Sequence, residues 1–500
     1  MYRKSYKKTV SLLMAVMIML TGCASPGQAD TKETVPVPET ETAVNMESEA
    51  ASETLESGSE EESENNDSSE TAAETAEASG TVESAESEEV ILGDEQFDEY
   101  IPLLEGKKVA LFSNHTGIVG DETSGIGELE EGQDASLIHF GYDKDGNEIS
   151  YGTHILDALI EKGVNVTAIF SPEHGFRGNE DAGAEVDNSV DEKTGVPILS
   201  LYGSDRKRAP ADEDMAKFDT LLIDMQDVGL RFYTYYISMY YLIDACAAEG
   251  KEVVLLDRPN PNGFYVDGPL LQEEYKSGVG ALPIPVVYGM TWGELAQMIN
   301  GEGWLDSGKD ACKLTVIPCK NYSHQTKTSL IRNPSPNLRD MKAVYLYSSI
   351  CFFENTAFSV GRGTDFPFEV FGSPYVKGAE GFVFEFTPVS SELTAEPQYM
   401  DQVCYGVDLR DTPVEEIWEK GINLEYLISA HDALKETAPE ESFWGNKDKD
   451  DNYWIDKLAG TDSLRKMIDE GKSAEEIKAS WQDDIESFKE QRKPYLLYAE

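Results

Sequence analysis

A carboxylate, an imidazole and a guanidinium lie close together in the segment 171–178, which reads SPEHGFRG. Its ionisable side chains are Glu173, His174 and Arg177. The segment follows a β-branched and aromatic run, 164–170, that is typical of a buried strand. Because ligands of open α/β sheets bind beyond the carboxyl ends of strands, the segment is predicted to be a catalytic loop. A polar turn held by an Arg–Glu pair is the alternative.

Polar side chains also follow three further predicted strands, at 107–113, 220–225 and 251–256. Strands that alternate with helical patterns predict a parallel, Rossmann-like sheet, which brings these strand ends to one edge. We therefore expect the polar side chains to form a pocket. They are Asn114 and His115 after the first strand, Asp227 and Arg231 after the second, and Asp257, Arg258 and Asn260 after the third.

Each of these clusters also has a structural interpretation. Asn114 could form a turn, and Asp227 with Arg231 could be a four-residue helical pair. Asp257 and Arg258 could form a solvated rim.

A second, smaller α/β domain is predicted from residue 312, with strands at 313–317 and 381–386. Its glycine-rich segment 361–364 is predicted to present Arg362 to a ligand, with Glu354 and Glu369 nearby in the sequence. The alternative is a glycine turn in which Arg362 pairs with one of these glutamates. Farther back, Thr291 and Glu294 fit a capping box, so Glu294 is predicted to be structural.

The sequence lacks the motifs that are typical of several other functions of such a fold. No G-x-G-x-x-G follows the first strand and no P-loop is present, so nucleotide binding has no support. No G-x-S-x-G elbow occurs, and the six histidines are scattered without a ligand pair, so no metal and no cofactor are predicted. Most of the five cysteines other than Cys23 are expected to be buried as small apolar residues.

The first 22 residues have a basic start, an apolar run and the ending Leu-Thr-Gly before Cys23. This pattern predicts a bacterial lipoprotein signal peptide, with Cys23 lipidated. Residues 24–90 contain twenty acidic side chains and a single lysine, which gives a net charge of −19. Residues 23–90 are therefore predicted to be a disordered tether. The protein is thus expected to be exported and lipid-anchored to the outer face of the cytoplasmic membrane.

The folded part is predicted to comprise a Rossmann-like domain at 91–311 and an α/β domain at 312–500. Residues 91–500 carry a net charge of −38, which argues against nucleic acid and against adsorption to an anionic membrane.

Seven ordered motifs together resemble the exo-β-N-acetylmuramidase family of the NamZ type, from about residue 106 to the end. They are N-x-TG at 114–117, SPEHG at 171–175, QDVG-x-R-x-YT at 226–234, DRPNP at 257–261, GMT-x-GE at 289–294, PSPN at 334–337 and GRGT at 361–364. The resemblance implies a Rossmann-like domain and a smaller α/β domain with the active site in the cleft between them. It also implies removal of β-1,4-linked N-acetylmuramic acid from non-reducing ends of peptidoglycan fragments.

Carried over, the resemblance makes Glu173 the catalytic residue, and glycoside hydrolysis fits it as a general acid whose pKa partial burial raises. His174 or Asp227 is expected to orient or complement it. Arg231 and Arg362 are candidates for holding the lactyl carboxylate of muramic acid. The residues expected to bind substrate are Asn114, Arg177, Arg231, Tyr233, Asn260, Asn337, Glu354 and Arg362.

Two features depart from the family pattern. Tyr288 stands where members often have a histidine, and the excursion 125–152 is longer than usual. Two alternatives remain open. One is a sugar- or muropeptide-binding lipoprotein without turnover, and the other is a metal-dependent wall hydrolase acting through His115, His174 and Asp227.

Overall fold

The computed structural model describes residues 90–119, 152–172, 176, 188–201, 209–327, 329–391 and 393–500. The predicted signal peptide, Cys23 and the tether up to residue 89 lie outside these residues, as does the excursion except for residue 152. Glu173, His174 and Arg177 also lie outside them. Every other side chain predicted to act in catalysis or substrate binding is described.

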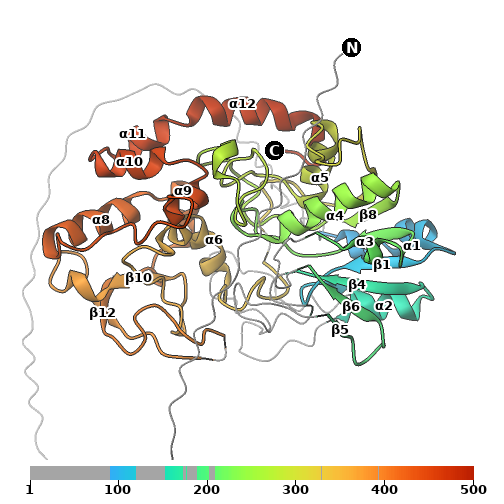
Figure 1. Ribbon diagram of the computed structural model, residues 1–500, viewed down its shortest axis with the longest axis horizontal. Coiled ribbons are helices and arrows are strands. Elements are labelled where there is room, and N and C mark those ends of the chain that lie inside the picture. The colour runs from blue at the N-terminus through green and yellow to red at the C-terminus, as the bar shows by residue number, and fades with distance from the viewer. Residues whose placement is uncertain are drawn as a thin grey trace, which may run out of the picture. The chain divides into compact units, whose positions relative to one another are not determined.

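A seven-stranded sheet has the strand order β5-β6-β4-β1-β7-β8-β9. Neighbouring strands are parallel, except that the edge strand β5 pairs antiparallel with β6. Figure 1 shows β1, β4, β6 and β5 in this spatial order. The parallel, Rossmann-like sheet is confirmed. Its strands are β1 (Val109–Phe112), β4 (Val166–Ser171), β5 (Ser189–Val190), β6 (Pro197–Ser200), β7 (Thr220–Ile223), β8 (Glu252–Leu256) and β9 (Lys313–Ile317).

Alternate residues of the central strand β1 face two different apolar cores. Ala110 and Phe112 pack into one core, and Val109 and Leu111 pack into the other. All four are fully buried. Because parallel sheets are covered on both faces, their strands are continuous apolar runs, and this is why the sequence pattern located them.

The chain leaves β1 in one direction, through β4 to β6, and then returns to the other side of β1 to form β7, β8 and β9. The strand order therefore reverses between β1 and β7. In sheets of this kind, ligands bind outside the carboxyl ends of the strands at such a switch point.

The helices of this part connect the strands. Helix α5 begins at the predicted capping box, in which Glu294 Oε2 accepts from the Thr291 N–H at 2.9 Å and Thr291 Oγ1 accepts from the Glu294 N–H at 3.3 Å. The structural role predicted for Glu294 is thus confirmed. The elements are β2 (Ile118–Val119) and β3 (Thr153–His154), which pair antiparallel, and helices α1 (Phe97–Leu104), α2 (Ile155–Glu161), α3 (Asp212–Met215), α4 (Tyr235–Glu249) and α5 (Trp292–Gly301).

The rest of the chain combines a small antiparallel sheet with helices. The sheet has the order β10-β12-β11, with β10 (Val370–Ser373), β11 (Phe384–Phe386) and β12 (Cys404–Asp408). Its helices are α6 (Met341–Ile350), α7 (Val414–Lys420), α8 (Glu425–Thr437), α9 (Trp454–Ala459), α10 (Ser463–Asp469), α11 (Ala474–Ala479) and α12 (Gln482–Arg492). The α/β character predicted for this region is confirmed.

The predicted domain boundary at residue 312 is wrong in one respect. Strand β9 was expected to open the second domain, but it pairs in parallel with β8 along its whole length, from Glu252↔Lys313 to Leu256↔Ile317. It is therefore the edge strand of the first sheet. A strand's pairing partner depends on residues far away in the sequence, which local patterns do not reveal.

The C-terminus returns to the segment that follows β8. Glu294 Oε1 accepts from the N–H groups of Leu497 at 2.8 Å and Tyr498 at 3.3 Å, and the Tyr498 hydroxyl donates to Asp257 Oδ2 at 2.6 Å. Figure 1 shows α12, in red, on the same side of the molecule as α5. Arg492, the last residue of α12, donates to the carbonyl of Gly289. These bonds tie the last residues to the strand end at Asp257.

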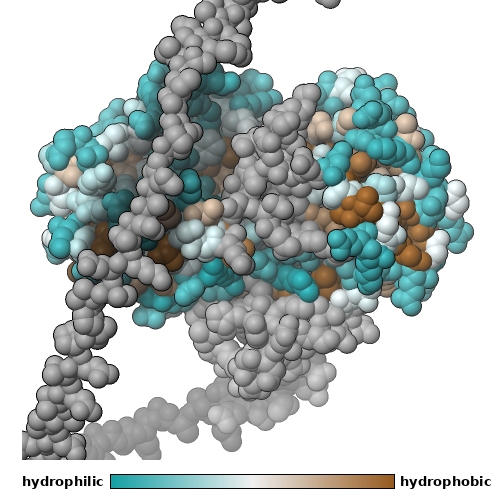
Figure 2. All heavy atoms as spheres, turned by 60° about the horizontal axis from the view of Figure 1, so that its bottom comes forward, coloured by the Kyte–Doolittle hydropathy of each residue, from teal (hydrophilic) through white to brown (hydrophobic). Residues whose placement is uncertain are grey.

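The described surface is mostly hydrophilic in the view of Figure 2, with apolar side chains in smaller patches. Within the described ranges, none of the helices is long and apolar enough to cross a bilayer. The cysteines beyond residue 90 are free and buried, as predicted: Cys246, Cys312, Cys319, Cys351 and Cys404.

Candidate active site

Two loops meet at the switch point, one after β1 and one after β7. Asn114 Oδ1 accepts from the backbone N–H of Thr116 at 2.9 Å and from its hydroxyl at 2.7 Å. The Thr116 hydroxyl in turn accepts from the Gln226 N–H at 3.0 Å. Asn114 is fully buried and forms a turn, which was the structural alternative for this residue.

Asp227 lies in the second of these loops and is 6% exposed. Its Oδ2 accepts from the Gly229 N–H at 2.7 Å and from the Tyr288 hydroxyl. Burial raises the pKa of Asp227 to about 6, although the bonds from Tyr288 and Gly229 act in the opposite direction. Tyr288 is therefore a fully buried hydrogen-bond donor to a carboxylate.

The loop after β4 starts beside β1, because Phe170 pairs with Phe112 and Ser171 is the next residue. Its catalytic candidates lie outside the described residues, but Phe176 is described and is 3% exposed. The Phe176 ring meets the His154 ring edge-on at 5.0 Å between centroids. His154 Nε2 lies 2.9 Å from the carbonyl oxygen of Asn114. Phe176 thus ties this loop to the turn after β1.

Arg231 does not form the helical pair with Asp227 that was its alternative interpretation, since the chain between them is a non-helical loop in which Gly229 has a φ of 75°. Its side chain is fully buried. Nη1 donates to the carbonyls of Pro269 at 2.8 Å and Ile284 at 2.6 Å, and Nη2 donates to that of Leu458 at 2.9 Å. Burial lowers the pKa of Arg231 to about 10. These contacts favour a structural role over that of a substrate clamp.

Arg258 and Asn260, after β8, are also inside the protein, and the solvated rim considered for Arg258 is not found. Arg258 Nε donates to Asp224 Oδ1 at 2.7 Å, and Nη2 donates to Asp94 Oδ2 at 2.6 Å. Asn260 Nδ2 donates to the carbonyl of Met290 at 2.9 Å. Both side chains hold loops of the sheet edge together.

The expected pocket at the strand ends is small among the described residues. A cavity of about 10 Å³ is lined there by Asp227, Arg258, Asn260 and their neighbours. Such a volume holds about one water molecule.

The loop at 333–338 connects the switch point to the second part of the chain. The carbonyl of Asn333 lies 2.8 Å from His115 Nε2, and the carbonyl of Pro334 accepts from the Tyr233 hydroxyl at 2.5 Å. Asn337 Oδ1 accepts from the Thr394 hydroxyl at 3.4 Å. The structure therefore links His115, Tyr233 and Asn337 through one loop.

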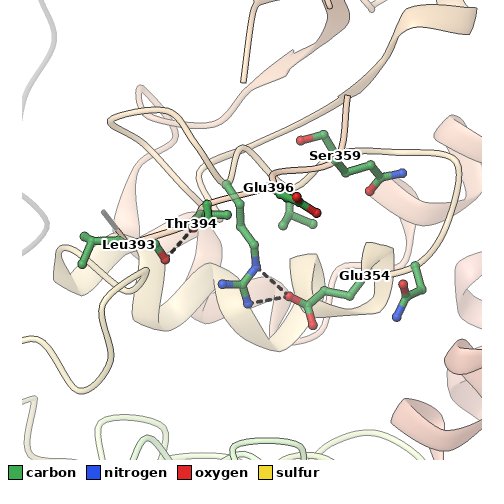
Figure 3. A pocket seen from close by; sticks show the side chains of 10 residues that line it. Glu354, Ser359, Leu393, Thr394 and Glu396 are labelled. Carbon is green, nitrogen blue, oxygen red and sulfur yellow. Dashed lines mark hydrogen bonds and ion pairs between the residues drawn. The ribbon is translucent and has the colours of Figure 1, made fainter. Parts of the chain in front are cut away.

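A pocket of about 510 Å³ lies in the second part of the chain, and Glu354 and Arg362 line it (Figure 3). Glu354 Oε1 accepts from Arg362 Nε at 3.0 Å and from Nη2 at 2.6 Å. The two predicted substrate-binding residues are thus brought together, in the internal ion pair that the sequence kept open as the alternative. Each side chain remains 24% exposed. Figure 3 shows Ser359, Thr394 and Glu396 around the same pocket.

Sequence reasoning missed Thr394, Glu396 and Gln398, which line this pocket from a segment without a motif. Their only sequence signal is polarity, which surface loops share. Glu369, noted beside Arg362 in the sequence, does not line the pocket. In the described ranges, no three His, Cys, Asp or Glu side chains are grouped so that they could hold a metal ion.

The chain is similar to two crystal structures of DUF1343 family proteins from Bacteroides fragilis NCTC 9343. The first has 50% sequence identity and a TM-score of 0.68, and the second has 26% identity and a TM-score of 0.64. Both matches cover 82% of this chain and 99% of the solved chain.

The chain is also 34% identical over 424 residues to the peptidoglycan β-N-acetylmuramidase NamZ of Bacillus subtilis strain 168, covering 81% of this chain and 90% of that protein. The family described as exo-β-N-acetylmuramidase NamZ matches in both its parts, the N-terminal one at residues 145–342 and the C-terminal one at 345–498. These matches span most of the chain and show that it is a member of the NamZ family of β-N-acetylmuramidases.

Proposed function

We propose that this protein is a peptidoglycan β-N-acetylmuramidase that releases N-acetylmuramic acid from non-reducing chain ends. The observation that carries the proposal is the relationship to the Bacillus subtilis enzyme, at 34% identity over 81% of this chain. Six of the seven motifs quoted above fall within the two family regions, and the one at 114–117 lies before the first region, which begins at residue 145. The arrangement of the sheet agrees with it, since the loops named by those motifs follow the carboxyl ends of β1, β4, β7 and β8.

Glu173 is proposed as the general acid that protonates the glycosidic oxygen. It follows Ser171, the last residue of β4, by two positions, and β4 is the neighbour of β1 at the switch point. Phe176, three positions after Glu173 in the sequence, is buried and packs against the ring of His154. Glycoside hydrolysis needs an acid whose pKa is matched to the working pH, and a partly buried carboxyl group meets that need.

Asp227 is proposed as a positioning residue, with His174 as a second candidate for orienting Glu173. Oδ2 of Asp227 already accepts hydrogen bonds from Gly229 and Tyr288, and the Asp227 side chain is buried. Its charge would therefore act on the site through the Tyr288 hydroxyl and the loop at 226–231. Arg177, Asn114, Tyr233 and Asn337 remain proposed substrate contacts or supports of such contacts.

Export and anchoring are proposed from the sequence alone. The basic and apolar start of the chain, Cys23 and the acidic segment after it fit an enzyme tethered outside the membrane, where peptidoglycan lies.

Turnover of two reporters tests the activity. The full chain should release para-nitrophenol from the β-N-acetylmuramide and not from the β-N-acetylglucosaminide. Saturable binding of the muramide without release would favour the binding-protein alternative.

Glycans with a defined sugar at the non-reducing end test whether the enzyme acts in the exo mode. A soluble glycan that begins with N-acetylmuramic acid at its non-reducing end should release the monosaccharide. The same glycan capped by N-acetylglucosamine should stay intact. Cleavage inside the capped glycan would contradict exo action.

A further inference from the structure

The segment 288–294 begins with Tyr288, whose hydroxyl donates to Asp227. The next residue, Gly289, has a φ of 60°, in the left-handed region that favours glycine. A Cβ at this position would lie 2.6 Å from the carbonyl oxygen of Tyr265, so another residue type would not fit without a shift of the backbone. The direction in which Tyr288 points therefore depends on a tight turn and on the contacts that hold this turn.

Residues 492–500 hold the turn from one side. Arg492, which is 4% exposed, donates through Nη1 to the carbonyl of Gly289. Its Nη2 donates to Glu500 Oε1 at 2.5 Å, which fixes the orientation of the guanidinium. The carbonyl at the turn thus accepts a hydrogen bond from a buried cation that another residue of the same segment orients.

Residues 492–500 also hold the other end of the segment 288–294, through Asp257. This fully buried carboxylate accepts at Oδ2 from the Thr291 hydroxyl and from the Tyr498 hydroxyl, both at 2.6 Å. Its Oδ1 accepts from the Gly293 N–H at 2.8 Å. Burial raises the pKa of Asp257 to about 6, and the bonds from Thr291 and Tyr498 act in the opposite direction. Tyr498 therefore helps to keep Asp257 an ionised acceptor for the segment.

Two tyrosine–aspartate pairs thus fix the segment 288–294. In one pair the segment supplies the donor, Tyr288, to Asp227. In the other pair the acceptor Asp257 binds the segment, and the donor Tyr498 comes from the end of the chain. Groups in one buried hydrogen-bond network affect one another, because a donor that is lost there is not replaced by bulk water.

We propose that residues 492–500 are a positioning element of the candidate active site. Tyr498 and Arg492 hold the segment 288–294 in the arrangement in which Tyr288 donates to Asp227. Both residues act through this segment and not by contact with the substrate. The inference rests on the proposed function for the claim that Asp227 serves catalysis, but the contacts themselves do not depend on it.

Turnover of para-nitrophenyl β-N-acetylmuramide by Tyr498→Phe tests the proposal. The variant loses only the hydroxyl, so kcat should fall about tenfold while KM changes less than about twofold. The matched control is Tyr495→Phe, whose hydroxyl donates at 2.7 Å to Glu302 Oε1, a carboxylate outside the segment 288–294. The control should keep the wild-type kcat. A wild-type kcat in Tyr498→Phe, or an effect on KM alone, would overturn the proposal.

Two substitutions of Arg492 separate positioning from a general loss of structure. Arg492→Met removes the donor to the Gly289 carbonyl and should lower kcat as Tyr498→Phe does. Arg492→Lys keeps a cationic donor and should retain at least about half of the wild-type kcat. Equal losses in the two variants, or no loss in Arg492→Met, would contradict the proposed role.

Combination with Tyr288→Phe tests the route. Because the donor to Asp227 is already absent in that background, adding Tyr498→Phe should lower kcat by less than a further twofold or so. The urea midpoints of the wild type, the two single variants and the double variant test the same coupling without turnover. The shift of the double variant should be smaller than the sum of the single shifts. Additive shifts would overturn the proposal, whereas an absence of turnover by the wild type would contradict the proposed function alone.

Discussion

Replacing Tyr288 by phenylalanine tests the hydrogen-bonded carboxylate beside the switch point. The variant loses only the hydroxyl that donates to Asp227 Oδ2, and the Gly229 N–H still donates to the same oxygen. Both Tyr288 and Asp227 are buried, so water does not replace the lost donor at full strength. We therefore expect the free energy of unfolding to fall, by an amount that depends on the charge of Asp227.

The size of the loss follows from the two states of Asp227. A hydrogen bond to a charged group contributes about 1.5–3 kcal/mol to stability, against about 0.5–1.5 kcal/mol for a neutral pair. Because the pKa of Asp227 is about 6, the residue is mostly ionised at pH 8 and mostly protonated at pH 5. The variant should lose about 2 kcal/mol at pH 8 and about 1 kcal/mol at pH 5. The difference corresponds to a rise of about 0.7 unit in the pKa of Asp227.

The sign of the pH dependence can be stated for the wild type as well. The folded pKa of Asp227, about 6, lies above the ordinary aspartate value of 3.8 that applies to the unfolded chain. Between these values the folded state holds a proton that the unfolded state has lost, so this residue makes stability fall as pH rises through the window. The fall is complete above the folded pKa. In Tyr288→Phe the window extends to higher pH.

Urea unfolding at pH 5 and pH 8 measures both effects. The control is Tyr399→Phe, which loses a half-buried hydroxyl that donates at 3.1 Å to a neutral backbone carbonyl, that of Ala357. Its loss should be the same at both pH values. An equal loss at both pH values for Tyr288→Phe would refute the reasoning, because Asp227 would then not be the ionising partner of Tyr288.

Three further results are expected. Arg231→Met should lower the free energy of unfolding by about 3–5 kcal/mol, since three buried carbonyls lose a charged donor; unchanged stability with a raised KM would instead support a substrate clamp. Arg258→Met should cost about 3–5 kcal/mol in urea unfolding, because the buried Asp94 and Asp224 lose their counter-ion, and a loss below about 1 kcal/mol would contradict this. Reporter turnover should survive dialysis against a chelator, since the proposed acid is a carboxyl group; loss restored by added metal would favour the metal-dependent alternative.

The sequence located the parallel strands of the large sheet well because each of them is a short run rich in apolar residues with a clear end. Strand β4 was expected to end before Ser171 and includes it, and β7 starts at Thr220 as predicted. The alternative for Arg362, an ion pair with Glu354, is the one found, and the sequence could offer it because the two residues are only eight positions apart. Features that depend on residues close together in the sequence could therefore be predicted.

Features that depend on residues far apart in the sequence could not be predicted from local patterns. The guanidinium of Arg231 bonds to carbonyls 38, 53 and 227 residues away, and its spacing from Asp227 suggested a helical pair instead. The membership of β9 in the first sheet likewise depends on β8, more than fifty residues earlier in the chain. In both cases the local pattern identified the residue or the strand correctly but indicated the wrong partner for it.

The hydrolysis of para-nitrophenyl β-N-acetylmuramide by Glu173→Gln tests the central claim most directly. Glutamine keeps the size of the side chain but cannot supply the proton, so kcat should fall by at least about a hundredfold. The matched control Glu213→Gln, an exposed residue of α3, should keep the wild-type kcat. Wild-type turnover by Glu173→Gln would contradict the claim that this carboxyl group is the general acid.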